Sequence, residues 1–140
     1  MVQALKLHQQ MKYLDISANQ IGSAGFLHFM ELFKNDSPLQ NLHVRKNQIK
    51  GEEIHDFTAA LSDNTNLFNL DLQDNLLDND CADKLIELLH DNYFIEDLII
   101  DGNNHINQTF KETILQECRK NLMIKEYILP NLKSVALKQF

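Results

Sequence analysis

The apolar and polar positions of this chain repeat every 28 residues. Four asparagines mark the repeat at that spacing: Asn19, Asn47, Asn75 and Asn103. The same three apolar positions precede each asparagine: Met11, Leu14 and Ile16; Leu39, Leu42 and Val44; Leu67, Leu70 and Leu72; Ile95, Leu98 and Ile100. Because four copies stay in register, the repeat is the feature that organises the chain.

The hydrophobic period changes within each repeat. The last two apolar positions before the asparagine alternate with polar ones, which predicts a short strand whose apolar side chains point inward. After the asparagine the spacing becomes helical: Phe26, Phe29, Met30 and Phe33; Ile54, Phe57 and Leu61; Ala82, Leu85, Ile86 and Leu89. Each repeat is therefore predicted to be a strand, a turn and a helix, with Leu42, Leu70 and Leu98 in one continuous core.

The pattern LxxLxLxxNxI resembles the leucine-rich repeat, and its length resembles the ribonuclease-inhibitor-like subclass. The resemblance implies an α/β fold: a leucine-rich-repeat solenoid, a curved horseshoe segment with parallel strands on the concave face and helices on the convex face. It also implies that Asn19, Asn47, Asn75 and Asn103 form a structural ladder, in which each side chain bonds backbone groups of neighbouring turns. Proteins of this class bind other proteins, and the resemblance implies the same activity here.

We expect residues 1–140 to form a single leucine-rich-repeat domain. Residues 1–10 would be the tail of a preceding repeat, because Leu5 has the register of the last helical core position. About four repeats would span residues 11–123. Residues 124–140 would form a C-terminal strand and cap, since Ile124, Tyr127 and Leu129 repeat the strand spacing one residue out of register.

The first predicted strand, residues 13–16, has no predicted strand ahead of it. Its backbone donors and the apolar flank of Met11, Leu14 and Phe29 would then face water, and a free sheet edge invites pairing. We therefore expect a preceding repeat or another subunit to cover this N-terminal edge.

The charge of the chain argues against two classes of ligand. With 13 Lys and Arg against 20 Asp and Glu, we expect no binding to nucleic acid, which needs cations to meet its phosphates, and none to an anionic membrane. Cys81 and Cys118 belong to no CxxC pair, which favours packing thiols over a zinc site or a disulfide. Without a leader segment or a membrane-length apolar run, a cytoplasmic location is expected.

The sequence contains no catalytic motif of the GxSxG, GxxxxGK[ST], HExxH or GxGxxG type. Its six histidines fall at different positions of the repeat. The acidic run from Asp71 to Asp80 lacks the glycine and glutamate of a calcium loop. Asp78, Asn79 or Asp80 is expected to cap the third helix instead. We expect no enzyme activity, no metal and no cofactor.

The outward positions of the predicted strands are the best candidates for a binding site, because they form a rigid array that loses little entropy on binding. Three columns follow: Tyr13, Asn41, Asn69, Asp97 and Glu126; Asp15, His43, Asp71, Ile99 and Ile128; Ser17, Arg45, Gln73 and Asp101. The residues predicted to bind a partner protein are Tyr13, Asp15, His43, Arg45, Asp71, Gln73, Asp97, Ile99 and Asp101. The acidic end of the array favours a partner with a basic surface.

Three functions remain open on the sequence. The first is a protein-interaction module or scaffold that binds through the concave strand face as part of a larger protein or complex. The second is a GTPase regulator resembling the Ran GTPase-activating protein, in which Arg45, Lys46 and Asn47 would form the basic group on the concave rim. The third is a cytoskeletal or ciliary structural component, suggested by an Asn-, Lys- and Ile-rich, Gly-poor composition that is typical of AT-rich protist genomes. An AT-rich intracellular bacterium would show the same composition.

Overall fold

The structure, a computed structural model, describes residues 10–33 and 37–130. Within these residues, four strands form one parallel sheet in chain order. They are β1 (Tyr13–Asp15), β2 (Asn41–His43), β3 (Asn69–Asp71) and β4 (Asp97–Ile99). Their register follows the sequence repeat, because Leu14 pairs with Leu42, Leu42 with Leu70, and Leu70 with Leu98.

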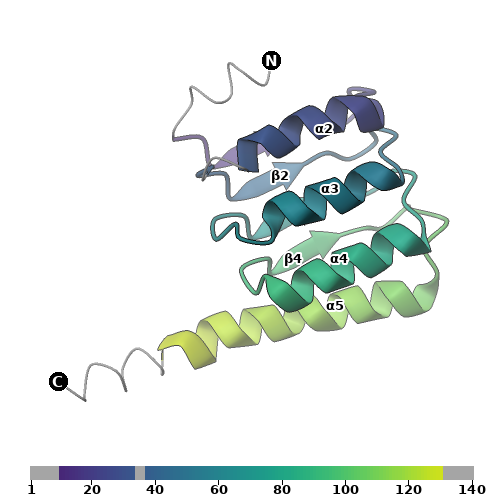
Figure 1. The fold of residues 1–140 in the computed structure, drawn as a ribbon. Helices are drawn as coiled ribbons and strands as arrows, with labels where there is room; N and C mark the ends of the chain where they lie inside the picture. The colour runs from purple at the N-terminus through teal and green to yellow at the C-terminus, as the bar shows by residue number, and fades with distance from the viewer. Residues whose placement is uncertain (1–9, 34–36, 131–140) are drawn as a thin grey trace.

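In the same part of the chain, four α-helices cover one face of the sheet (Figure 1). They are α2 (Gly22–Phe33), α3 (Glu52–Leu61), α4 (Asn79–Asp91) and α5 (Gln108–Met123). Each helix packs against the next one in chain order. The prediction of an α/β fold with a parallel sheet is therefore confirmed. None of the helices within the described residues combines the length and the apolar character that crossing a membrane requires.

The core lies between the sheet and the helices. Leu42, Leu70 and Leu98 are buried in one cluster with apolar helix residues, as predicted. In the N-terminal half of this cluster, Phe26 of α2 and Phe57 of α3 have ring centroids 4.6 Å apart. Because the cluster runs through every repeat, each strand and helix depends on its neighbours to bury its apolar face.

A ladder of asparagine side chains joins the turns that follow the strands. The Asn47 Oδ1 accepts a hydrogen bond from the Asn19 backbone N–H, and its Nδ2 donates to the Ile16 carbonyl. Asn75 repeats this pattern on the next turn. The Asn103 Oδ1 accepts from the Leu77 backbone N–H, and its Nδ2 donates to the Leu72 carbonyl. Since these amides satisfy backbone groups that the turns bury, the asparagines hold neighbouring repeats together.

A second asparagine ladder, which sequence reasoning missed, lies in the turns that follow the helices. The Asn92 Nδ2 donates to the carbonyls of Leu61 and Asn64, and the Asn121 Nδ2 donates to the carbonyl of Asn92. Asn64 and Asn92 are 28 residues apart. The repeat search that found the first ladder could therefore have found this one.

The C-terminal strand predicted within residues 124–140 is wrong. Helix α5 continues directly into a π-helical turn, η1 (Ile124–Ile128). Residues 122–129 contain no Gly, Pro, Asn or Asp, so no turn residue ends the helix there. Glu126 and Ile128 consequently lie on a helical segment and not in the outward columns of the sheet.

The N-terminal edge also differs from its prediction. Phe29, expected to face water, is buried, and Met11 and Leu14 are partly buried against the core. Strand β1 is the edge strand of the described sheet. Residues 1–9, which hold Leu5 and most of the predicted tail, lie outside the described residues, as do residues 131–140 of the predicted cap.

Candidate functional site

The face of the sheet opposite the helices, which we call the strand face, carries all nine predicted binding residues. The parallel register lines up its residues in rows: Tyr13, Asn41, Asn69 and Asp97; Asp15, His43, Asp71 and Ile99; and, just after the strands, Ser17, Arg45, Gln73 and Asp101. Successive strand residues point to opposite faces. Since the alternate leucines lie in the core, these rows lie on the free side.

An aromatic pair occupies the strand face at β1 and β2. The Tyr13 hydroxyl and the His43 Nδ1 are 3.1 Å apart and share a hydrogen bond. Their ring centroids are 5.0 Å apart in an edge-to-face arrangement. Tyr13 is nevertheless 53% exposed. The pair therefore offers a partner an aromatic surface that is already held in position.

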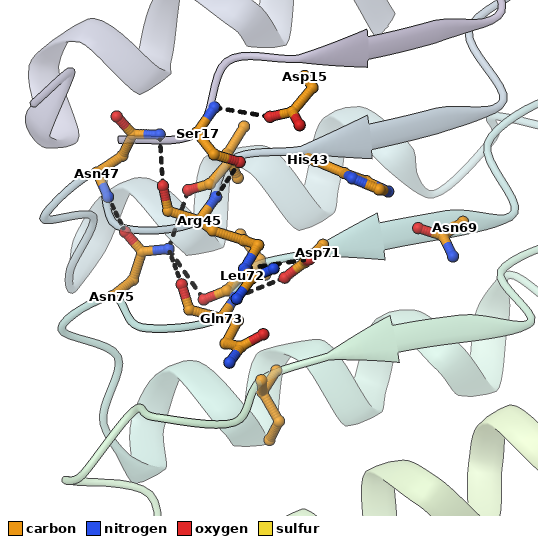
Figure 2. Close-up of polar contacts among 12 residues, drawn as sticks. Asp15, Ser17, His43, Arg45, Asn47, Asn69, Asp71, Leu72, Gln73 and Asn75 are labelled. Carbon is orange, nitrogen blue, oxygen red and sulfur yellow. Dashed lines mark hydrogen bonds and ion pairs between the residues drawn. The ribbon is translucent and has the colours of Figure 1, made fainter. Parts of the chain in front are cut away.

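A polar network crosses the strand face where the strands end (Figure 2). The Ser17 hydroxyl accepts a hydrogen bond from the Arg45 backbone N–H. The hydrogen bonds that Ser17 donates, from its hydroxyl and its backbone N–H, lower the pKa of Asp15. The Arg45 Nε lies 3.6 Å from the Asp71 Oδ2, and the Asp71 Oδ1 accepts from the Gln73 N–H. These contacts join three neighbouring strands.

The burial of Asp71 and of Asn47 changes two interpretations of the sequence. Asp71, predicted to contact a partner, is only 4% exposed, because Arg45 and the turn at Gln73 cover it. In the unbound chain its charge therefore faces Arg45 and not solvent. Asn47, considered for the basic rim of a GTPase regulator, is buried in the asparagine ladder. This placement leaves only Arg45 and Lys46 of that group at the surface.

The β4 end of the strand face is acidic. Asp97 and Asp101 are exposed, with the half-buried Ile99 between them. The Asn69 Nδ2 donates a hydrogen bond of 2.8 Å to the Asp97 Oδ2, which fixes the orientation of the amide. The Asn69 Oδ1 is then left without a donor among the described residues. This end of the strand face therefore presents two carboxylates as hydrogen-bond acceptors and a small apolar patch at Ile99.

Other candidate chemistry in the chain serves the fold. Asp78 caps α4 by accepting a hydrogen bond from the Cys81 N–H, which lowers the pKa of Asp78. Burial raises the pKa of the Cys81 and Cys118 thiols to about 11, so both stay protonated at neutral pH. Within residues 10–33 and 37–130, no three His, Cys, Asp or Glu side chains are placed to hold a metal ion.

Comparisons with known proteins define the class of the fold. No protein-family model and no curated protein matches the chain. Among solved structures, actin-binding site 2 of leiomodin-1 matches with a TM-score of 0.78 and 16% identity, over 96% of this chain and 78% of that one. The tropomodulin C-terminal domain of Caenorhabditis elegans matches with a TM-score of 0.57 and 9% identity, over 96% of this chain and 98% of that one. The chain thus has a fold of the leucine-rich-repeat type, similar to these two domains.

Proposed function

We propose that this chain is a protein-binding module of the actin cytoskeleton, with actin as its partner. The observation that carries the proposal is the fold shared with actin-binding site 2 of leiomodin-1, which extends over 96% of this chain. Because one fold supports many functions, the proposal also rests on the surface. The strand face combines an exposed tyrosine with exposed carboxylates on a rigid sheet, and such residues suit selective protein binding.

We further propose that the repeats form a curved solenoid of the ribonuclease-inhibitor-like subclass. Strands in a sheet lie about 4.8 Å apart, whereas packed helices lie about 8–10 Å apart, so a stack of strand–helix units bends toward its strands. The strand face is then concave, and a partner contacts several rows at once. In this proposal the chain performs no catalysis and acts in the cytoplasm as part of a larger protein or complex, in which a preceding repeat or another subunit covers β1.

Charge favours a basic surface on the partner. Arg45 offsets the charge of Asp71, so the excess negative charge of the strand face comes from Asp15, Asp97 and Asp101. Lysine or arginine side chains opposite these carboxylates increase both the association rate and the selectivity.

Binding assays with actin test the proposal. We expect the purified chain to cosediment with filamentous actin or to bind monomeric actin in fluorescence anisotropy. Tyr13→Ser combined with His43→Ser should weaken binding about tenfold or more, because aromatic side chains contribute a large share of interface energy. The melting temperature should change little, since Tyr13 is exposed and His43 lies on the free face.

Leu76→Ser is the matched control for this variant. Leu76 is 50% exposed, close to the value for Tyr13, but it lies in the loop between β3 and α4, outside the strand face. An equal loss of binding in Leu76→Ser would contradict the proposed binding face. Failure of the wild-type chain to bind either form of actin would contradict the proposed partner.

A further inference from the structure

The outer edge of β4 opens onto a groove. The groove has a volume of about 300 Å³ and lies between β4 and the N-terminal half of α5. Leu98 and Ile100 line it from the strand, and Ile114 and Leu115 line it from the helix. Leu115 is 52% exposed although it belongs to the layer that packs against the sheet. Leu98, Ile100 and Ile114 are buried, so Leu115 supplies the apolar surface that is open to solvent beside the strand edge.

The backbone of β4 offers hydrogen bonds to this groove. The groups of Asp97 and Ile99 bond to the β3 side, so those of Leu98 and Ile100 point away from β3. The Ile100 carbonyl accepts a hydrogen bond from the Asn103 side chain, and the Leu98 backbone also contacts the Cys118 thiol of α5. Strand β4 is the last strand of the described sheet. The Leu98 carbonyl and the Ile100 N–H therefore have no strand beside them within the described residues.

The rim of the groove carries an excess of negative charge. Asp97, Asp101 and Glu112 lie on it with one cation, Lys111. Asp97 and Asp101 also belong to the strand face, so the groove continues the surface on which the proposed function rests. A ligand that fills the groove must match apolar walls on one side and carboxylates on the other.

We propose that the β4 edge binds an extended segment of a partner protein as a fifth strand of the sheet. Its backbone donates to the Leu98 carbonyl and accepts from the Ile100 N–H. Because strand side chains alternate, one set lies beside Asp97 and Asp101 and carries lysine or arginine. The other set points into the groove toward Leu115 and is aliphatic. The inference rests on the proposed function only in taking the ligand to be a protein.

A peptide of alternating lysine and valine, about six residues long as in an ordinary strand, is the probe. One control peptide has glutamate in place of lysine, and another is N-methylated at the amides that would face Leu98. We expect the lysine peptide to bind in fluorescence anisotropy and both controls to bind at least about tenfold more weakly, because they lose charge complementarity or strand hydrogen bonds. In the complex, the Ile100 amide should exchange with solvent at least about tenfold more slowly.

Variants of the groove test the same site from the side of the protein. Leu115→Ser and Glu112→Lys should each weaken binding of the lysine peptide by about fivefold or more, through lost apolar contact and lost attraction. Leu122→Ser is the matched control, because Leu122 is 38% exposed on the same helix and does not line the groove. Tyr13→Ser with His43→Ser should leave peptide binding unchanged. A loss of peptide binding at the groove and a loss of actin binding are therefore separate results.

Three results would overturn the proposal. The first is equal binding of the glutamate peptide or the N-methylated peptide, which would exclude the stated chemistry. The second is an Ile100 amide already as protected as that of Ile99 in the free protein, because the chain itself would then fill the groove. The third is that the chain binds no peptide but forms a dimer, and that Leu115→Ser dissociates this dimer. A second copy of the chain would then occupy the groove.

Discussion

Leu70 occupies the middle of β3 and is fully buried, with a strand on each side and the helices beneath. Leu70→Ala should lower the free energy of unfolding by about 2–5 kcal/mol, the usual cost of truncating a buried leucine. Leu76→Ala is the matched control, since Leu76 is half exposed in the loop after the same strand, and should cost less than about 1 kcal/mol. Urea denaturation measures both changes. A loss below about 1 kcal/mol for Leu70→Ala would contradict the shared core.

Glu117 on α5 is a buried carboxylate that contacts Lys120 and His90. The hydrogen bond from the Lys120 ammonium lowers the pKa of Glu117. A carboxyl group with a lower pKa in the folded state contributes stability above its unfolded pKa, and this contribution is lost as the pH falls through the folded pKa. The stability difference between wild type and Glu117→Gln should therefore be present above the unfolded pKa of a glutamate carboxyl and shrink below about pH 4. Urea denaturation across this range measures it, and a difference independent of pH would contradict the prediction.

The turns show what the sequence could not reveal at the level of single residues. The residue before each ladder asparagine has a left-handed backbone: Ala18, Lys46, Asp74 and Gly102. This conformation costs a non-glycine residue about 1–2 kcal/mol, and only one of the four positions is glycine. The hydrogen bonds of the ladder offset that cost. The repeat therefore predicts where each turn lies, whereas its conformation depends on contacts between repeats.

At the scale of the element, alternate amides of β1 face opposite sides. The Ile16 N–H donates to the His43 carbonyl, and the parallel register directs the Leu14 N–H to β2 as well. The N–H groups of Tyr13 and Asp15 point to the outer edge. We expect these two to exchange at least about tenfold faster than those of Leu14 and Ile16. Hydrogen exchange followed by NMR measures all four. Equal protection would mean that the edge is covered in the isolated chain, contrary to this prediction.

The strands and helices that were predicted correctly share a sequence feature that the wrongly predicted C-terminal strand lacks. In four repeats an asparagine separates the alternating period of the strand from the helical period that follows. In the segment from Ile124 to Leu129 the strand spacing has no asparagine after it within the same register. Its first two apolar positions, Ile124 and Tyr127, are three residues apart, and this spacing suits a helix as well as a strand. Without a residue that ends α5, the helix continues.

At the scale of the whole molecule, the sequence predicted the composition of the strand face but not its internal contacts. The period assigns each residue to a row, because neighbouring strands pair in register. It does not reveal which side chains bond across strands. Arg45 and Asp71 were both expected to meet a partner, and they lie 3.6 Å apart instead. That contact helps to bury Asp71. The carboxylates of the strand face that remain exposed for binding are therefore those of Asp15, Asp97 and Asp101.

The acidic β4 end is where charge should decide binding to the partner. Asp97→Lys combined with Asp101→Lys replaces two exposed carboxylates by two cations, so a basic partner surface would meet repulsion. We expect the affinity to fall by about a hundredfold, and the effect to shrink at high salt, because exposed charges are screened. The melting temperature should change little, since both side chains point away from the core. Anisotropy titrations at low and high salt measure the affinity.

Asp56→Lys combined with Asp83→Lys is the matched control for this charge reversal. Both residues are exposed on helices, on α3 and α4, so the variant has the same net charge while the strand face stays unchanged. Nonspecific attraction depends on the net charge of the whole molecule, whereas a specific interface depends on where the charge lies. We expect the control to retain nearly full affinity. If the control variant loses binding and the Asp97 and Asp101 variant retains it, the partner contacts the helical side of the molecule and the strand face is not the interface.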